Sequence, residues 1–478
     1  MTLNRGVQRA IIGTYFAALA VIYAIAWLAP AVGLARDDAA YLLTARAIAT
    51  GQGYPQTQFP PVFPGLLALF TLISQQTQWL KALPLLCTAG WLVLTHKLLL
   101  KMGASRNDAF LLVGLTAASP MVVFLSTNLM AESCFALLMT AALLALLEER
   151  AWLAGCFAGL ATLTRIAGVP LIVVCMLTLV VRRRFRSAII FAAVATIMAA
   201  PWFGWALAHP SNTYRGWNVL TGLAASEKAT VLGRNIGWLF ATPFSLLSGF
   251  SNIFGTWIFI AVLAWSLFVR RQLLPDLLIV LYSLVLICWT WPPERFVAPI
   301  LPLVFWIVWR VFRLMELREA LAALVLIFCL LPVAADVIRL PATRSSGYFP
   351  VSGQIVDDWP EMQKLFTLIR AHTSPEDVLL ANMNDVFYLN TGRRTIRGFN
   401  PTGFELFYSP RPLIVTPDGL THAIREAQVR YVGLTPDQGM PESAAFHRSI
   451  EALERGGVLE TVIAPGLSRD YRLLRVTR

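Results

Sequence analysis

The chain has 478 residues, of which 57% are hydrophobic and only 14% are charged, and its mean hydropathy is +0.64. Because soluble domains carry about 25% charged residues, this composition excludes an ordinary soluble enzyme and predicts an integral membrane protein. The net charge of +12 could indicate a nucleic-acid surface, but basic and acidic residues are about equal in number after Pro341. The basic surplus therefore lies between the hydrophobic segments, which is typical of membrane topology and argues against a nucleic-acid partner.

Apolar segments with the length of a bilayer-crossing helix, about 20 residues, recur up to Leu340. The first of them is longer than the apolar region of a signal peptide, so we interpret it as an uncleaved transmembrane helix. The segment 151–181 contains Arg165 and Pro170, so it is either one long helix or two short helices that form a hairpin; the loop charges favour the hairpin. With that hairpin, the sequence predicts an all-α polytopic bundle of about 11 transmembrane helices. The other predicted spans lie near residues 10–31, 79–100, 108–127, 133–148, 187–207, 252–269, 273–291, 297–313 and 319–338.

Positively charged residues between the spans orient the chain, because Lys and Arg accumulate in cytoplasmic loops. A cytoplasmic N-terminus places all of the basic clusters inside: Lys97/Lys101/Arg106, Arg150, Arg182/Arg183/Arg184/Arg186, Arg270/Arg271 and Arg310/Arg313/Arg318. This orientation requires that the apolar segment 60–74 does not cross the membrane. Its closely spaced prolines, Pro60, Pro61 and Pro64, favour a helix that lies at the interface. We expect a bacterial cytoplasmic (inner) membrane protein whose C-terminus lies outside the cytoplasm.

The composition changes after Leu340 and divides the chain into predicted domains. These are a transmembrane domain at 1–340, a linker rich in Pro, Ser and Gly at 341–352, and a soluble extracytoplasmic α/β domain at 353–478. Helices and strands alternate in the last domain, which favours βαβ-like pairing. The predicted helices are Glu361–His372, Leu420–Ala427 and Ser443–Arg455, and the predicted strands are Val378–Ala381, Arg430–Leu434, Leu459–Ala464 and Tyr471–Val476.

Charged residues in the predicted outside segments are the candidates for chemistry. Asp37 and Asp38 begin a short helix, where one carboxylate would suffice as a cap, so we expect at least one of them to face a polar cavity. Glu132 could orient an acceptor, hold a divalent cation with Asp37 and Asp38, or only start the following helix. Arg165 and Arg295 could bind a phosphate, or could extend toward the interface as Arg near span ends often does.

Four short motifs follow one another on the predicted outer side. They are Asp37-Asp38 with Tyr41, Gly51, Gly53 and the Pro-rich entry at Pro60, Pro61 and Pro64; Met130–Phe135 with Glu132; Leu163-Thr164-Arg165; and Glu294–Pro299 with Arg295. In this order they resemble the motifs of the polytopic GT-C glycosyltransferases, in particular the protein O-mannosyltransferase and lipid A aminoarabinose transferase branch. Asp38 departs from the pattern, because many members have Glu there.

The resemblance implies a GT-C fold and transfer of one sugar from a polyprenyl-phosphate donor to a hydroxyl of a glycan, lipid or protein acceptor on the extracytoplasmic face. The leaving group is already a phosphate, so one general base and a cationic phosphate site suffice, and a single displacement inverts the anomeric carbon. We expect Asp37 to be that base. The expected site residues are, for catalysis, Asp37, Asp38 and Glu132; for the donor phosphate, Arg165 and Arg295; and for the substrate groove, Tyr41, Arg46 and Tyr54.

Alternatives to this function stay open. The scheme requires no cofactor, and a divalent cation on Asp37, Asp38 and Glu132 is the one metal site to consider; the histidines have no zinc-ligand spacing. A transporter or flippase of a lipid-linked sugar would also use membrane-embedded charges, but it should show broken helices in repeated halves, and we find no such repeat. A third alternative is a catalytically silent relative whose C-terminal domain binds a partner.

Overall fold

A computed structural model describes most of the chain, and it divides into two compact units. The first consists of Met1–Leu28 with Thr44–Ile338, and the second of Ala29–Leu43 with Arg339–Arg478. The sequence alone assigned Ala29–Leu43 to the transmembrane domain, whereas in the structure this segment groups with the C-terminal residues. The described residues are 5–33, 37–54, 59–209, 219–248, 264–265, 272–312, seven positions between 330 and 338, 359–436, 441–462 and 466–477.

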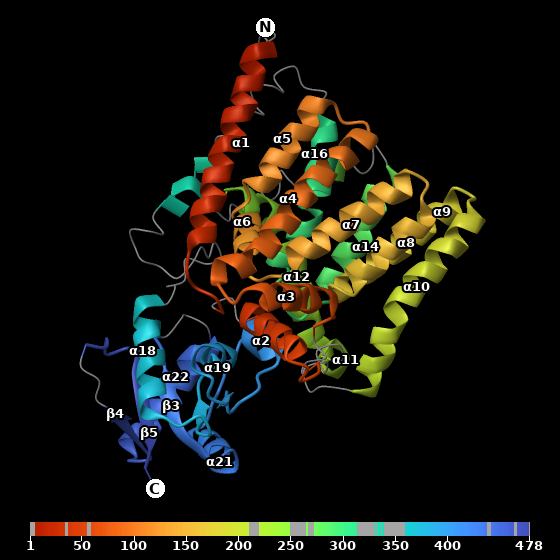
Figure 1. Ribbon diagram of the computed structural model, residues 1–478. Coiled ribbons are helices and arrows are strands. Elements are labelled where there is room, and N and C mark those ends of the chain that lie inside the picture. Colours follow the sequence, from red (N-terminus) through yellow and green to blue (C-terminus); the bar gives the residue numbers. More distant parts are fainter. Residues whose placement is uncertain are drawn as a thin grey trace. The chain divides into compact units, whose positions relative to one another are not determined.

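The first unit is helical (Figure 1). Its helices are α1 (Arg5–Leu28), α2 (Asp37–Ala49, which begins in the second unit), α3 (Val62–Ile73), α4 (Thr77–Lys101), α5 (Arg106–Ala117), α6 (Pro120–Thr127), α7 (Glu132–Leu147), α8 (Ala151–Thr162), η1 (Ile166–Gly168), α9 (Val169–Val181), α10 (Phe185–Ala208), α11 (Val219–Gly222), α12 (Ala225–Ser248), α14 (Leu273–Ile287), α15 (Glu294–Val297), η3 (Ala298–Ile300) and α16 (Leu301–Phe312).

Among the described residues, three helices are long and apolar enough to cross a membrane: α1, α4 and α10. The bent pair of α5 and α6 would make a fourth, and α7, α8, α9 and α14 are shorter apolar helices. The predicted span 252–269 lies almost wholly outside the described residues, and the predicted span 319–338 lies mostly outside them. An integral membrane bundle is therefore supported, and the count of about 11 spans stays a prediction.

Helix breaks follow from local chemistry. The predicted hairpin in 151–181 is confirmed, because α8 ends at Thr162 and α9 begins at Val169. The single span predicted at 108–127 is bent by 67° between α5 and α6, because Pro120 lacks an amide hydrogen and disfavours helical geometry at Ser119. Helix α3, which follows Pro60-Pro61, has 12 residues and is about 18 Å long, and its position at the interface stays a prediction.

Polar contacts between loops show which loops lie at the same end of the helical unit. Arg184 Nη2 forms an ion pair with Glu149 Oε1 at 2.6 Å, so the loops before α8 and α10 lie at the same end. The Gln272 side chain donates to the Met102 carbonyl oxygen at 3.1 Å, which joins the loop after α4 to the start of α14. These loops carry basic clusters predicted to be cytoplasmic. Glu132 is the first residue of α7 and therefore lies at the end of this helix that is far from Glu149.

Helices α8 and α10 lie side by side because two glycines let their backbones approach closely (Figure 1). A β-carbon added to Gly155 would lie 2.6 Å from the Phe191 carbonyl oxygen, and one added to Gly159 would lie 2.7 Å from Met198 Cβ. Real β-carbons do not come so close. This spacing of two small residues four positions apart is typical of packed membrane helices.

We expect Gly155→Ala to destabilise the bundle by about 1 to 3 kcal/mol, because the added methyl group must push α10 away. The matched control is Gly204→Ala in α10, where an added β-carbon meets nothing within 4 Å. That control should melt at or slightly above the wild-type temperature, since Ala favours helix over Gly. Thermal unfolding of both variants in detergent checks the prediction, and equal melting temperatures would contradict it.

The second unit contains a five-stranded sheet of order β2-β1-β3-β5-β4. Strand β1 is parallel to β2 and β3, while β5 is antiparallel to β3 and β4, so the predicted βαβ-like pairing is confirmed for part of the sheet. The strands are β1 (Val378–Leu380), β2 (Thr395–Ile396), β3 (Val429–Leu434), β4 (Leu459–Val462) and β5 (Arg472–Val476), and the helices are α18 (Trp359–His372), α19 (Asn384–Thr391), α20 (Gly403–Phe407), α21 (Pro417–Glu426) and α22 (Pro441–Arg455).

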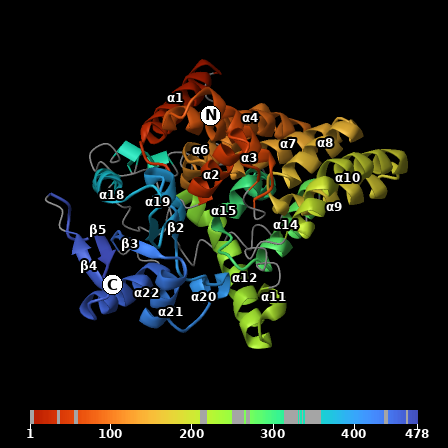
Figure 2. The ribbon, with the colours of Figure 1, turned by 60° about the horizontal axis from the view of Figure 1, so that its bottom comes forward.

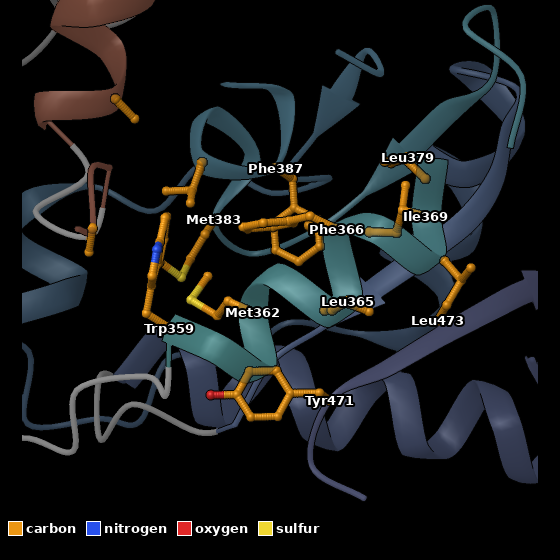
Figure 3. Packing of buried hydrophobic residues seen from close by; sticks show 14 residues of the cluster. Trp359, Met362, Leu365, Phe366, Ile369, Leu379, Met383, Phe387, Tyr471 and Leu473 are labelled. Atoms are coloured by element: carbon orange, nitrogen blue, oxygen red, sulfur yellow. The ribbon is translucent and has the colours of Figure 1, made fainter. Parts of the chain in front are cut away.

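Helices cover both faces of this sheet (Figure 2). Successive strand residues point to opposite faces, so Leu379 packs with the α18 and α19 side chains and Leu380 with those of α21 and α22. In the first cluster, Phe366 and Phe387 meet edge to face at 5.4 Å (Figure 3). Ala39 belongs to the same cluster, which explains why the segment before α2 groups with this unit.

Candidate functional site

Glu132 is a buried carboxylate at the first position of α7. Its side chain is only 1% exposed, and it follows a tight turn in which the Asn128 side-chain amide donates to the Phe124 carbonyl oxygen at 2.9 Å. Next to it, Ser133 Oγ accepts a hydrogen bond from Thr88 Oγ1 of α4 at 2.8 Å. A buried charge in a membrane unit is costly, so Glu132 needs cationic partners.

Two arginines provide that charge. Arg165 Nη1 lies 2.6 Å from Glu132 Oε1, and Arg295 Nε lies 3.6 Å from the same oxygen. Both guanidinium groups also lie 4.8 Å from the centre of the Phe296 ring, close enough for cation–π attraction. The structure thus brings together three of the residues selected from the sequence. The cluster has two positive charges and one negative charge, and the arginine side chains are 15% and 28% exposed.

Backbone packing holds Arg165 in this position. Arg165 lies in extended conformation between α8 and η1, and its amide donates to the Ala161 carbonyl oxygen at 2.9 Å. A β-carbon on Gly168 would lie 2.7 Å from the Thr162 backbone, so only glycine permits this turn. The Val62 amide donates to the Leu163 carbonyl oxygen at 3.0 Å, which joins the start of α3 to the Arg165 turn.

Lys81 is a buried cation that sequence reasoning missed. It lies in α4, is 1% exposed, and precedes Thr88 by seven residues, which is about two helical turns on the same face. Because Thr88 contacts Ser133, Lys81 lies on the face of α4 that is turned toward α7. Its distance from Lys97 and Lys101, which lie at the other end of the same apolar helix, was the available signal, since ionisable residues within membrane helices are functional candidates.

Asp37 and Asp38 are in different environments, both in the second unit. Asp38 is 1% exposed; its Oδ2 accepts from the Gly33 amide at 2.6 Å and its Oδ1 from the Ala39 amide at 3.0 Å. Asp37 is partly exposed at the first position of α2. Asp38 therefore joins Gly33 to the start of α2, whereas Asp37 keeps contact with solvent.

The three residues expected to line a groove have distinct contacts. Tyr41 is 2% exposed, and Arg46 Nε donates to Gln75 Oε1 at 3.1 Å. The Tyr54 ring lies 5.1 Å from that of Trp202, in an aromatic cluster of the first unit. Their role in a groove stays a prediction.

The sequence left open a divalent cation on Asp37, Asp38 and Glu132. Within the part of the chain that the structure describes, no group of three or more His, Cys, Asp or Glu side chains could hold a metal ion. The positions next to Glu132 are taken by two guanidinium groups, and both Asp38 oxygens accept backbone hydrogen bonds. A divalent cation on Glu132 would have to compete with these two guanidinium groups, and a metal site at Asp37, Asp38 and Glu132 stays a prediction.

The chain thus combines an apolar helical unit, which holds a buried Glu–Arg cluster, with an α/β unit. Over its whole length the chain is similar to the solved structure of ArnT from Cupriavidus metallidurans bound to undecaprenyl phosphate, with a TM-score of 0.59, 12% identity, and coverage of 97% of this chain and 98% of that one. The apo state of the same protein gives a TM-score of 0.57 at 11% identity and covers 98% of both chains.

A mycobacterial arabinofuranosyltransferase, AftD, has a TM-score of 0.43 and 16% identity, and the match covers 100% of this chain and 42% of that one. No family model and no curated protein sequence matches the chain. The similarity to ArnT therefore establishes the fold, which the sequence motifs had predicted.

Proposed function

We propose that this protein is an inverting glycosyltransferase that moves a sugar from a polyprenyl-phosphate donor to an acceptor hydroxyl on the extracytoplasmic face of the bacterial inner membrane. The observation that carries the proposal is the pairing of Arg165 and Arg295 with one buried carboxylate in a membrane unit. This cluster keeps a net positive charge for an anionic head group. The ArnT structure, which has the same fold, holds undecaprenyl phosphate.

The two arginines are suited to the donor phosphate. Guanidinium groups bind phosphate oxygens in a bidentate way and offset the charge that develops on the leaving phosphate. Glu132 holds Arg165, and Phe296 lies against both guanidinium groups, so these donors are fixed before the ligand arrives. Preorganised donors of this kind contribute to rate because they need no rearrangement during the reaction.

Asp37 acts as the general base in this proposal. It removes the proton of the acceptor hydroxyl as the oxygen attacks the anomeric carbon, and the C–O bond to the phosphate breaks with its electron pair leaving on the phosphate. Asp38 keeps the loop in place through its two backbone hydrogen bonds. Tyr41, Arg46 and Tyr54 complete the substrate groove in this proposal.

The experiment that tests the proposal separates transfer from transport. The purified chain is reconstituted in sealed vesicles with radiolabelled undecaprenyl phosphates that carry a hexose or a pentose, with and without bacterial envelope extract as acceptor. We expect label to move from lipid to acceptor only when both are present on the same side as the C-terminal domain. Movement of intact labelled lipid across the bilayer without any acceptor would instead support a flippase.

A further inference from the structure

Sheets of α/β proteins commonly bind ligands at the carboxyl ends of their parallel strands, and the carboxyl end of β1 is such a position here. The chain runs from β1 to β2, which pairs with one edge of β1, and then crosses to β3, which pairs with the other edge of β1. Such a change of direction leaves a crevice outside the carboxyl ends of parallel strands, because the connections run away from it on both sides. The crevice lies between the carboxyl ends of β1 and β3, so this topology selects the residues that directly follow β1.

Polar residues occupy this end of the sheet. Asn382 follows β1 and is 8% exposed, and its Oδ1 has no hydrogen-bond partner among the described residues. Arg397 follows β2, and its Nε donates to the Asn382 carbonyl oxygen at 3.1 Å. Asp385, in the first turn of α19, accepts one hydrogen bond from the Asn384 side chain at 2.9 Å. A buried acceptor without a partner is costly, which is a reason to expect a ligand donor here.

The segment that leads into α2, and the acidic start of α2 itself, pack against the same place. A β-carbon on Gly33 would lie 3.5 Å from a methyl group of Val386, the residue after Asp385, and 3.4 Å from Ala39. Gly33 is also the residue whose amide donates to Asp38. The start of α2, with Asp37 at its first position, is thereby fixed beside the start of α19.

The charges at this place interact. Burial raises the pKa of the Asp385 carboxyl; the positive charge of Arg397 opposes this rise and the negative charge of Asp37 adds to it. A carboxyl group in this setting is a strong hydrogen-bond partner for uncharged hydroxyl groups, whereas an anionic ligand would be repelled by the pair of acidic residues.

We propose that the carboxyl end of β1 is the acceptor subsite, in which Asp385 and Asn382 bind neighbouring hydroxyl groups of a carbohydrate acceptor and present one hydroxyl to Asp37. The inference rests on the proposed function and specifies its acceptor as a saccharide. Asp385 and Asn382 position the acceptor, and Asp37 remains the residue that takes the proton.

The test uses the full chain in lipid nanodiscs and synthetic glucan, mannan, galactan and arabinan oligosaccharides as probes. Saturation-transfer NMR measures their binding to the wild type and to Asp385→Asn and Asn382→Ala. The matched control is Asp418→Asn, an exposed aspartate at the start of α21. We expect at least one oligosaccharide to bind to the wild type and to Asp418→Asn, and the dissociation constant to rise about tenfold or more in the two subsite variants.

Kinetics then separate positioning from a general structural effect. With the oligosaccharide that binds and a labelled undecaprenyl-phosphate sugar, Asp385→Asn and Asn382→Ala should raise the KM for the oligosaccharide while the KM for the lipid donor stays at the wild-type value. Equal oligosaccharide binding in all four proteins, or no binding to the wild type, would overturn the inference. Because binding is measured without donor, failure of sugar transfer would count against the proposed function alone.

Discussion

Asp37→Asn should reduce sugar transfer by about 10²- to 10⁴-fold, the range expected when a general base is removed. Asparagine keeps the size of the side chain but cannot accept the proton of the acceptor hydroxyl. The loss should appear in kcat, with the KM for the lipid donor nearly unchanged, because the donor phosphate is assigned to Arg165 and Arg295. Initial rates with a radiolabelled undecaprenyl-phosphate sugar provide the measurement.

The control for this prediction is the neighbouring Asp38→Asn. Both Asp38 oxygens accept backbone hydrogen bonds, so this variant should lose thermal stability in the segment before α2 but retain more transfer activity than Asp37→Asn. The opposite order of activities, in two variants with comparable melting temperatures, would show that the base had been assigned to the wrong carboxylate.

Glu132→Ala should cause the largest loss of stability, about 3 to 5 kcal/mol, because removal of the carboxylate leaves two partly buried guanidinium groups without their counter-charge. We expect a large fall in melting temperature and a low yield of folded protein in detergent. Addition of undecaprenyl phosphate should restore part of the lost stability, since its phosphate would supply the missing negative charge.

The matched control is Glu149→Ala, which removes the carboxylate of the ion pair with Arg184 at the other end of α7. Glu149 is 64% exposed, so water replaces the lost partner and the melting temperature should stay near that of the wild type. If both variants melted at the same temperature, the buried Glu–Arg cluster would have no special role in the fold.

Local patterns in the sequence predict much of this fold. The hairpin around Arg165 was predictable because a charge and a proline interrupt an apolar segment, and the strands at β1 and β3 because short apolar runs are bounded by turn residues. Helix α19, strand β2 and helix α20 were missed, since they are short and mixed in composition. Helix α12 was missed for a similar reason, because Glu227, Lys228 and Arg234 lower its hydropathy below that of a span.

The candidate site was less predictable, because its contacts join residues far apart in the chain. Glu132, Arg165 and Arg295 were each selectable as charges beside apolar segments, but only the fold shows that one carboxylate contacts both arginines. The difference between Asp37 and Asp38 depends on which backbone amides reach each carboxylate. Asp385 carried no signal in the sequence, since its relation to Asp37 depends on how the segment before α2 packs against α19.

The most direct measurement is the fate of the donor lipid and of the anomeric carbon. Undecaprenyl-phosphate sugar labelled with ¹³C at the anomeric carbon is incubated with the wild type in nanodiscs and an envelope acceptor, and NMR with mass spectrometry follows the products. The account predicts one undecaprenyl phosphate released for each sugar transferred, with inverted anomeric configuration, and about 10²- to 10⁴-fold slower formation of both products with Asp37→Asn. Retained configuration, or transfer without release of the lipid phosphate, would contradict it.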